Sequence, residues 1–159
     1  PREHVSLKVR VVPAVPGRFL VAGEDDPAVP LTLDPANYAR YDSLVRLVEA
    51  VDAAALADAY VRYYPLLQEA YAELGYPTRQ FHGRLLEVID HLLETPAVAP
   101  GPVRLERPHV LYVYADPALE RLSAGQKALL RMGPVHAAAV RARLAGFRAA
   151  LVERAGTAD

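Results

Sequence analysis

The segment from residue 81 to residue 94 constrains the fold most strongly, because its apolar residues recur at helical spacing without a break. At 100° per residue the apolar positions cover one arc of a helix: Phe81, Leu85, Val88, Ile89, Leu92 and Leu93. The opposite arc is polar and carries Arg84, Glu87, Asp90 and His91. A helix of this kind buries only one face, so the rest of the chain must supply elements that cover it.

Helices are also predicted on the N-terminal side of this segment. Asp34 and Asp52 each precede a helical stripe, and an aspartate there can accept a hydrogen bond from a free first-turn amide. Pro65 lies inside the second stripe, where we expect a kink or a break into two helices. Thr78 is the expected cap of the helix that continues to about Glu94.

The C-terminal part of the chain gives further helix starts. Asp116 and Pro117 pair a capping residue with a proline, and Ser123 with Gln126 forms a capping box. Pro134 begins the last predicted helix. Its expected buried positions recur at helical spacing: Val140, Leu144, Phe147 and Leu151.

Four short segments predict strands. Residues 5–12 alternate between apolar and polar side chains, and residues 18–22 follow them after a turn. Residues 103–106 and 109–114 predict a second pair, in which Pro108 forces an edge position or a bulge. The predicted fold is therefore α+β and predominantly helical, with five to six helices packed with a small antiparallel β-sheet.

The length of 159 residues fits a single domain, which we expect to span residues 1–159. Its expected parts are a β-hairpin and loop in 1–32, helices in 33–95, a proline-rich connector in 96–102, strands in 103–115 and helices in 116–155.

The net charge of −1 argues against nucleic acid, whose binding needs a dominant positive field. The absence of cysteine excludes disulfides, thiolate catalysis and cysteine-bound metals. No stretch approaches the roughly 20 apolar residues of a membrane span.

Basic residues are distributed unevenly despite the balanced total. The chain has six basic residues and no acidic one between positions 121 and 148: Arg121, Lys127, Arg131, Arg141, Arg143 and Arg148. We expect these side chains to be solvated or paired within the chain. Docking to an acidic partner or to anionic lipid is the alternative.

The polar arc of the 81–94 helix is the first candidate site. Glu87 and His91 lie four residues apart and could form half of a metal site or an acid–base pair. We favour an exposed helical salt bridge that Arg84 completes, because a zinc-protease helix needs two histidines at that spacing. No catalytic residue, metal site or cofactor is therefore predicted.

The second candidate site consists of aromatic residues around His82. This histidine projects into the apolar arc, where we expect it to donate to a backbone carbonyl or to a tyrosine hydroxyl. Ligand binding in an apolar cleft is the alternative. The chain has nine tyrosines, most of which packing explains. Tyr64, which lies off the main helical stripe, and Tyr112, on a predicted strand, complete a candidate tyrosine-lined ligand site.

Three segments together resemble one bacterial family. They are LDPANYARYDSLV (33–45), YYPLLQEAYAELGYP with FHGRLLEVIDHLL (63–77 and 81–93), and RPHVLYVYADPALERLSAGQKALLRMGP (107–134). The chain resembles the family catalogued as domain of unknown function 3014 over nearly its whole length. The resemblance implies a protein of the cell envelope, anchored by an upstream transmembrane helix and a proline-rich linker on the periplasmic side of the cytoplasmic membrane.

The same resemblance bears on completeness and on one histidine. We expect the chain to be a fragment of a longer protein, with its anchor upstream. The family domain begins with an earlier helical segment, so the fragment is expected to expose an apolar groove or to dimerise through it. The family pattern suggests Asn where this chain has His82, which argues against an obligatory catalytic or metal-ligating histidine there.

Three functions follow as hypotheses. The first is a non-enzymatic domain, tethered at the envelope, that binds another envelope protein or itself. The second is a domain that binds a small ligand or a cell-wall fragment in a cleft around His82, Tyr64 and Tyr112. The third is an unrecognised hydrolase built on Glu87, Asp90 and His91.

Overall fold

The computed structural model describes residues 15–76, 78, 80–98 and 101–156. Within these ranges the elements follow in the order β1 (Val21–Ala22), β2 (Thr32–Leu33), the 3-10 helix η1 (Pro35–Tyr41), α1 (Asp42–Ala50), α2 (Ala53–Glu73), α3 (Phe81–Leu93), β3 (Leu105–Glu106), β4 (Val113–Tyr114), α4 (Pro117–Glu120), α5 (Ala124–Arg131) and α6 (Gly133–Gly156). The predominantly helical α+β prediction is confirmed.

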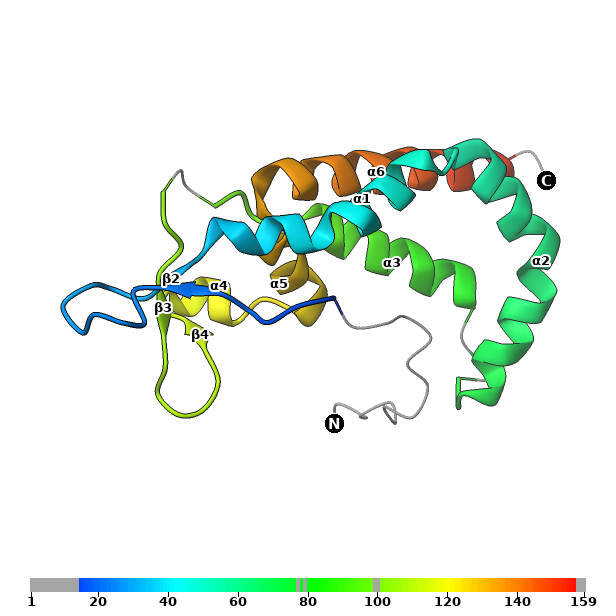
Figure 1. Ribbon diagram of the computed structural model, residues 1–159. Coiled ribbons are helices and arrows are strands. Elements are labelled where there is room, and N and C mark those ends of the chain that lie inside the picture. The colour runs from blue at the N-terminus through cyan, green and yellow to red at the C-terminus, as the bar shows by residue number, and fades with distance from the viewer. Residues whose placement is uncertain (1–14, 77, 79, 99–100, 157–159) are drawn as a thin grey trace.

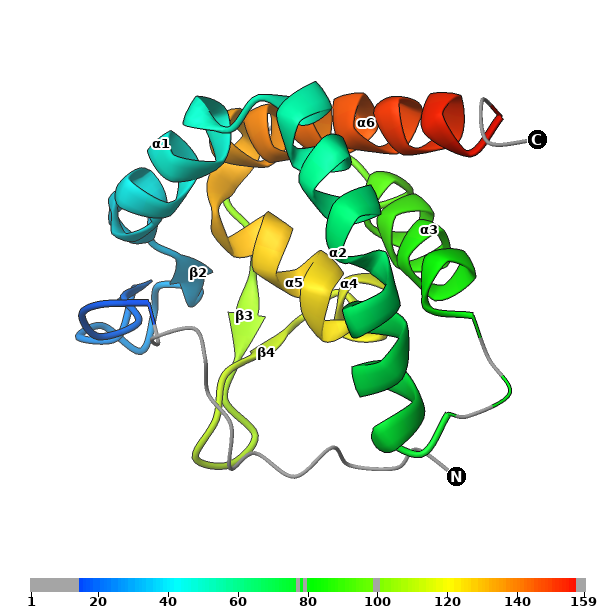
Figure 2. The same cartoon turned by 90° about the vertical axis from the view of Figure 1, so that its right-hand side faces the viewer.

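Helix α6 organises the molecule, because it packs against α1, α2, α3 and α5. Figures 1 and 2 show it running along one side of the fold, with α2 and α3 descending from it at one end and the strands lying toward the other. Burial follows the same division. A cluster centred on Ala57, Ile89 and Leu151 joins α2, α3 and α6, and a cluster centred on Leu33, Leu105 and Tyr114 lies beneath the strands.

Most predicted helix starts are confirmed by their capping hydrogen bonds. The Asp34 carboxylate accepts from Ala36 N at 2.8 Å, and the Asp52 carboxylate accepts from Ala55 N at 2.8 Å. The Ser123–Gln126 capping box forms in both directions. These starts were predictable because the donor and the acceptor lie within three residues of each other.

The predicted cap of α3 is wrong. The helix begins at Phe81 rather than directly after Thr78, and its N-cap residue Gln80 makes no capping hydrogen bond with its side chain. Instead, Gln68 Oε1 on α2 accepts a hydrogen bond from Phe81 N at 2.8 Å. A neighbouring helix therefore satisfies a first-turn amide that the local sequence leaves open.

Pro65 does not break α2, which is continuous from Ala53 to Glu73. The ribbon of α2 curves along its length (Figure 1). A proline removes one backbone donor, and the hydrogen bonds of the flanking turns hold the remaining helix together. Of the two expected outcomes, a break is therefore wrong.

The strands form two short antiparallel pairs, β1 with β2 and β3 with β4. An isolated bridge between Thr32 and Arg104, together with hydrogen bonds from Leu33 N to Val103 O and from Leu105 N to Leu31 O, holds the two pairs side by side. The predicted strand at 5–12 lies outside the described residues. The partner of β1 is β2, a strand that the sequence analysis did not predict.

Asn37 is fully buried and joins η1 to the segment before β1. Its Oδ1 accepts from Leu20 N at 2.9 Å, and its Nδ2 donates to Leu20 O at 2.6 Å and to Asp34 O at 2.8 Å. The Asn37 side chain thus pairs with the backbone N–H and C=O of Leu20 in the way that a neighbouring strand would. This pairing positions the segment before β1 beside η1, where Arg18 and Phe19 form one wall of a cavity described below.

Candidate functional site

The structure brings two of the predicted ligand-site residues together. His82 and Tyr64 line a cavity of about 630 Å³ between α2, α3 and the end of α6, which we call the tyrosine cleft. Their rings meet edge to face with centroids 6.4 Å apart. Tyr60 lines the same cleft, and its hydroxyl lies 3.1 Å from His82 Nδ1. His82 therefore has the tyrosine partner that its place in the apolar arc suggested.

Burial in the tyrosine cleft favours the protonated form of the Tyr60 hydroxyl. Burial, with a smaller effect from Tyr64, raises the pKa of Tyr60 to about 12. The Tyr60 hydroxyl therefore stays protonated at neutral pH and can donate to His82 Nδ1. The Tyr64 hydroxyl donates to Gln68 Oε1 at 3.2 Å, the same oxygen that caps α3.

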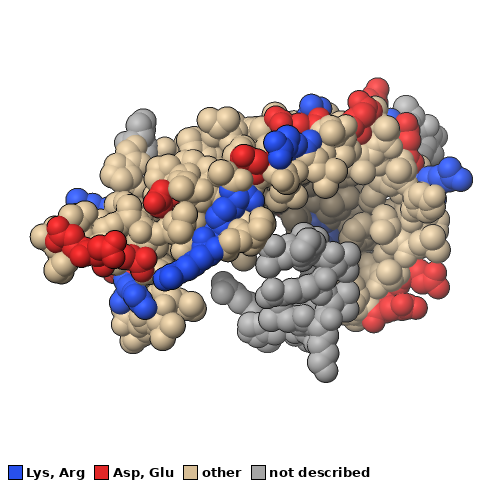
Figure 3. All heavy atoms as spheres, viewed as in Figure 1, with Lys and Arg blue, Asp and Glu red and all other residues tan. Residues whose placement is uncertain are grey.

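Tyr112 does not belong to the tyrosine cleft. It lies just before β4 and lines a different cavity. Its hydroxyl donates to Glu24, and the guanidinium of Arg107 lies 5.3 Å from its ring centroid. Glu24 belongs to an acidic stretch, residues 24–26, in the loop between β1 and β2. Figure 3 shows acidic side chains gathered at that end of the molecule, with a stripe of basic side chains beside them.

The four polar residues of the α3 face form three separate contacts. Arg84 forms an exposed salt bridge of 3.0 Å with Glu87. Asp90 accepts two hydrogen bonds from Arg148 on α6, one of them from Nη2 at 3.0 Å. His91 Nε2 lies 2.8 Å from Ser123 Oγ at the start of α5. Within the described ranges, no group of three His, Cys, Asp or Glu side chains could hold a metal ion.

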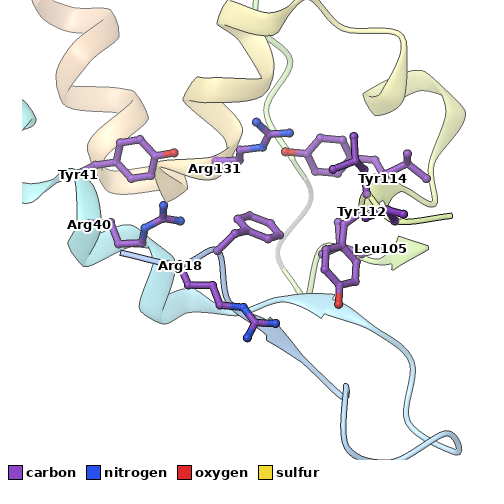
Figure 4. Close-up of a pocket in the computed structure, with 11 residues that line it drawn as sticks. Arg18, Arg40, Tyr41, Leu105, Tyr112, Tyr114 and Arg131 are labelled. Carbon is purple, nitrogen blue, oxygen red and sulfur yellow. The ribbon is translucent and has the colours of Figure 1, made fainter. Parts of the chain in front are cut away.

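A cavity that sequence reasoning missed lies between the segment before β1, η1, α5 and the β3–β4 loop. Its volume is about 490 Å³, and Arg18, Arg40 and Arg131 line it from three different elements (Figure 4). Among the residues that the structure describes, no aspartate or glutamate lines it. We call it the arginine cavity. Its volume falls within the roughly 300–1,000 Å³ typical of ligand sites.

The three guanidinium groups have no acidic partner in the described part of the chain, where the salt bridges join other residues. Among the described residues, Arg40 donates to neutral acceptors alone: to Pro16 O at 2.8 Å, to Gly17 O at 3.1 Å and to Asn37 Oδ1 at 3.0 Å. The Arg131 guanidinium lies 6.0 Å from the Phe19 ring centroid. Arg40 is therefore held in place without a charged partner among the described residues.

Tyr114 adds a buried polar atom to the arginine cavity. The residue is 5% exposed, and its hydroxyl hydrogen has no acceptor among the described residues. Figure 4 shows this hydroxyl pointing toward the Arg131 guanidinium. Burial is the main cause that raises the pKa of Tyr114, with Arg131 acting in the opposite direction. The hydroxyl stays protonated at neutral pH and can donate to a ligand oxygen.

Acidic side chains close to the arginine cavity are engaged elsewhere. Glu120 pairs with Lys127 and accepts from Tyr114 N at 2.9 Å, and these two contacts, with a smaller effect from Arg131, lower the pKa of its carboxyl group. Glu24 is bound to Tyr112. Lys127 and Arg148 of the basic run are thus paired within the chain, as expected, whereas Arg131 faces the cavity.

The apolar rim of the arginine cavity is exposed. Val110 and Leu111, in the loop between β3 and β4, line it and are 79% and 77% exposed. Nothing in the local sequence around Arg18 or Arg40 predicted this site, because its arginines come from distant segments. The basic run that contains Arg131 was the only signal.

Comparison with known protein families gives a match over most of the chain. A family model described as "Protein of unknown function (DUF3014)" matches residues 1–148. Neither the curated proteins nor the solved structures contain a match to the chain. None of the helices in the described ranges is both long enough and apolar enough to cross a membrane.

Proposed function

Because the chain belongs to the family described as protein of unknown function DUF3014, we propose that it is a non-enzymatic interaction domain, tethered at the bacterial cell envelope, that binds a protein partner. The proposed location is the periplasmic side of the cytoplasmic membrane, with an upstream transmembrane anchor. The observation that carries the interaction role is the exposed apolar pair Val110 and Leu111 at the rim of the arginine cavity.

These two side chains belong to a loop that is held in place. The hydroxyl of Tyr112 is bound to Glu24, and the Arg107 guanidinium lies over the Tyr112 ring. A fixed loop loses little conformational entropy when a partner covers it, and exposed aliphatic side chains gain free energy from burial in an interface. The loop is therefore suited to contact another protein.

The separate contacts of the α3 polar residues support a non-enzymatic role. Glu87 pairs with Arg84, and Asp90 pairs with Arg148, so neither carboxylate is placed to orient His91. His91 contacts Ser123, whose Oγ also accepts the capping hydrogen bond from Gln126 N. The serine hydroxyl thus takes part in the start of α5.

Site-specific photocrosslinking in the intact, anchored protein tests the proposal. A photoreactive residue replaces Val110 in one variant and Val135, which is 78% exposed on α6, in a matched control. We expect a protein adduct of defined mass at position 110 and none at 135. An adduct of twice the protomer mass would identify the partner as a second copy.

The supporting variant combines Val110→Ser with Leu111→Ser. Because both side chains are exposed, this variant is expected to keep the melting temperature and to lose the adduct formed by a crosslinker at neighbouring position 109. Equal crosslinking at 110 and 135, or none at either, would refute an interaction role for this loop.

The second candidate function is binding of a small ligand or cell-wall fragment in the tyrosine cleft. The 630 Å³ cavity beside His82 and Tyr64 favours it. Tyrosine fluorescence during titration with soluble peptidoglycan fragments tests it, with Val61→Tyr as a variant that narrows the cleft. Saturable quenching that this variant abolishes would support ligand binding, and a linear response would exclude it for these fragments.

A further inference from the structure

The arginine cavity carries an inference about the chemistry of the partner, and it rests on the proposed interaction function. We propose that the partner inserts a carboxylate between Arg18, Arg40 and Arg131, so that this domain recognises an extended acidic polypeptide segment.

The arginine cavity carries positive charge that no salt bridge of the described chain offsets. Three guanidinium groups line one cavity, and no carboxylate of the described chain pairs with any of them. Like charges held near one another in a partly enclosed site raise the electrostatic energy of the free protein. An anion that enters the cavity relieves this repulsion, so anionic ligands are favoured over neutral or cationic ones.

The position of the Arg40 guanidinium is fixed by hydrogen bonds. Arg40 is held by Pro16 O, Gly17 O and Asn37 Oδ1, so its position is set before any ligand arrives. A guanidinium has five N–H donors in a planar fork, which suits the two oxygens of a carboxylate. Arg18 belongs to the segment before β1 and Arg131 to α5, so the two approach a ligand in the cavity from different elements.

The Tyr114 hydroxyl adds a neutral hydrogen-bond donor to the arginine cavity. It is buried, belongs to a residue that lines the cavity, and has no acceptor for its hydrogen among the described residues. A buried hydroxyl whose hydrogen finds no acceptor destabilises the free protein. A ligand oxygen in the cavity can accept its hydrogen, which provides a neutral donor beside the three cations.

The shape and lining of the arginine cavity favour a polypeptide over a lipid surface. The guanidinium groups line a concavity rather than a protruding face, and the apolar side chains of Val110 and Leu111 line the same concavity. A polypeptide can present an acidic side chain and an aliphatic side chain a few ångströms apart. A polypeptide can therefore contact the guanidinium groups and the aliphatic side chains of the concavity at once. A broad lipid surface contacts groups that protrude from a protein instead.

The test begins with selection of random peptides on the 159-residue chain by phage display. We expect recovered peptides to share an Asp or Glu next to an aliphatic residue. Fluorescence anisotropy then gives the Kd of a recovered peptide and of its Gln or Asn analogue. Arg18→Gln and Arg131→Gln should each weaken the acidic peptide about tenfold, whereas Arg143→Gln, an exposed change on α6 outside the cavity, should not.

The same measurements contain the outcomes that would overturn the proposal. Recovery of no peptide, or of peptides without acidic residues, would do so. So would acidic peptides that bind the Arg18→Gln variant as tightly as the parent; because Arg18 is exposed, this variant should fold normally. Binding to phosphatidylglycerol vesicles through these arginines, without peptide binding, would assign the site to lipid instead. A dimer that Asp25→Asn with Asp26→Asn dissociates would assign it to a second copy.

Failure of this inference can be separated from failure of the proposed function. If the recovered peptides were apolar and lost affinity only when Val110 and Leu111 became serine, the interaction role would stand. The proposed recognition of a carboxylate would then be refuted. Loss of the crosslink at position 110 together with recovery of no peptide would remove both.

Discussion

The side-chain oxygen of Gln68 accepts a hydrogen bond from Phe81 N at 2.8 Å, so α2 supplies the cap of α3. The same oxygen accepts from the Tyr64 hydroxyl at 3.2 Å. One glutamine thus links the start of α3 to a wall of the tyrosine cleft. The residue at the N-cap position itself, Gln80, makes no capping hydrogen bond with its side chain.

Gln68→Ala should lower the free energy of unfolding by about 1 kcal/mol, because it leaves the Phe81 amide and the Tyr64 hydroxyl without this acceptor. Gln80→Ala is the matched control and should change stability by less than about 0.5 kcal/mol. Urea unfolding of both variants measures the difference. Equal losses would show that the position in sequence, not the contact across helices, stabilises α3.

Asn37→Ala should lower the free energy of unfolding by about 3 kcal/mol, since it removes the partner of Leu20 N and of Leu20 O in a buried site. Asn37→Asp keeps an acceptor for Leu20 N and loses both donors of the amide. Chemical denaturation of the two variants would contradict this role if the alanine variant stayed within about 0.5 kcal/mol of the parent.

Asp90 should make stability depend on pH through Arg148. The Arg148 hydrogen bond holds the pKa of Asp90 below its ordinary value of 3.8 in the folded chain. The charged carboxylate therefore favours the folded state above pH 3.8, and this contribution is lost as the pH falls through the lowered value. Asp90→Asn should reduce stability at neutral pH and have no effect in strong acid.

The control for this prediction is Arg148→Gln, which removes the partner. In that background Asp90→Asn should have little effect at any pH, as a double-mutant cycle followed by urea midpoints would measure. An effect of Asp90→Asn that persists without Arg148 would assign the pH dependence to another group.

Two glycines should respond oppositely to substitution by alanine. Gly133 has a φ of 81°, and a Cβ there would lie 2.7 Å from the Tyr38 ring, so Gly133→Ala should destabilise by about 2 kcal/mol. Gly83 lies in α3, and a Cβ added to it would meet no other atom within 4 Å among the described residues, so Gly83→Ala should stabilise by about 0.5–1 kcal/mol. Differential scanning calorimetry would refute the argument if both changes shifted Tm in the same direction.

Helix content and most helix starts could be predicted from the sequence, because their causes are local. A cap and its amide are two or three residues apart, as at Asp52 and Ala55, and an apolar arc repeats at the period of the helix itself. The same locality explains why α3 was recognised as amphipathic and why its end near Glu94 was predicted correctly.

The tertiary structure decided which residues share a site. His82 and Tyr64 meet because α2 packs on α3, whereas Tyr112 lies in another cavity that no spacing in the sequence indicates. Arg18, Arg40 and Arg131 converge because Asn37 holds the segment before β1 against η1 while α5 closes the opposite side. Hydrogen bonds between distant segments carry no periodic signature. The sequence alone therefore determined the helices and their buried faces, and the packing of those faces determined where uncompensated charge gathers.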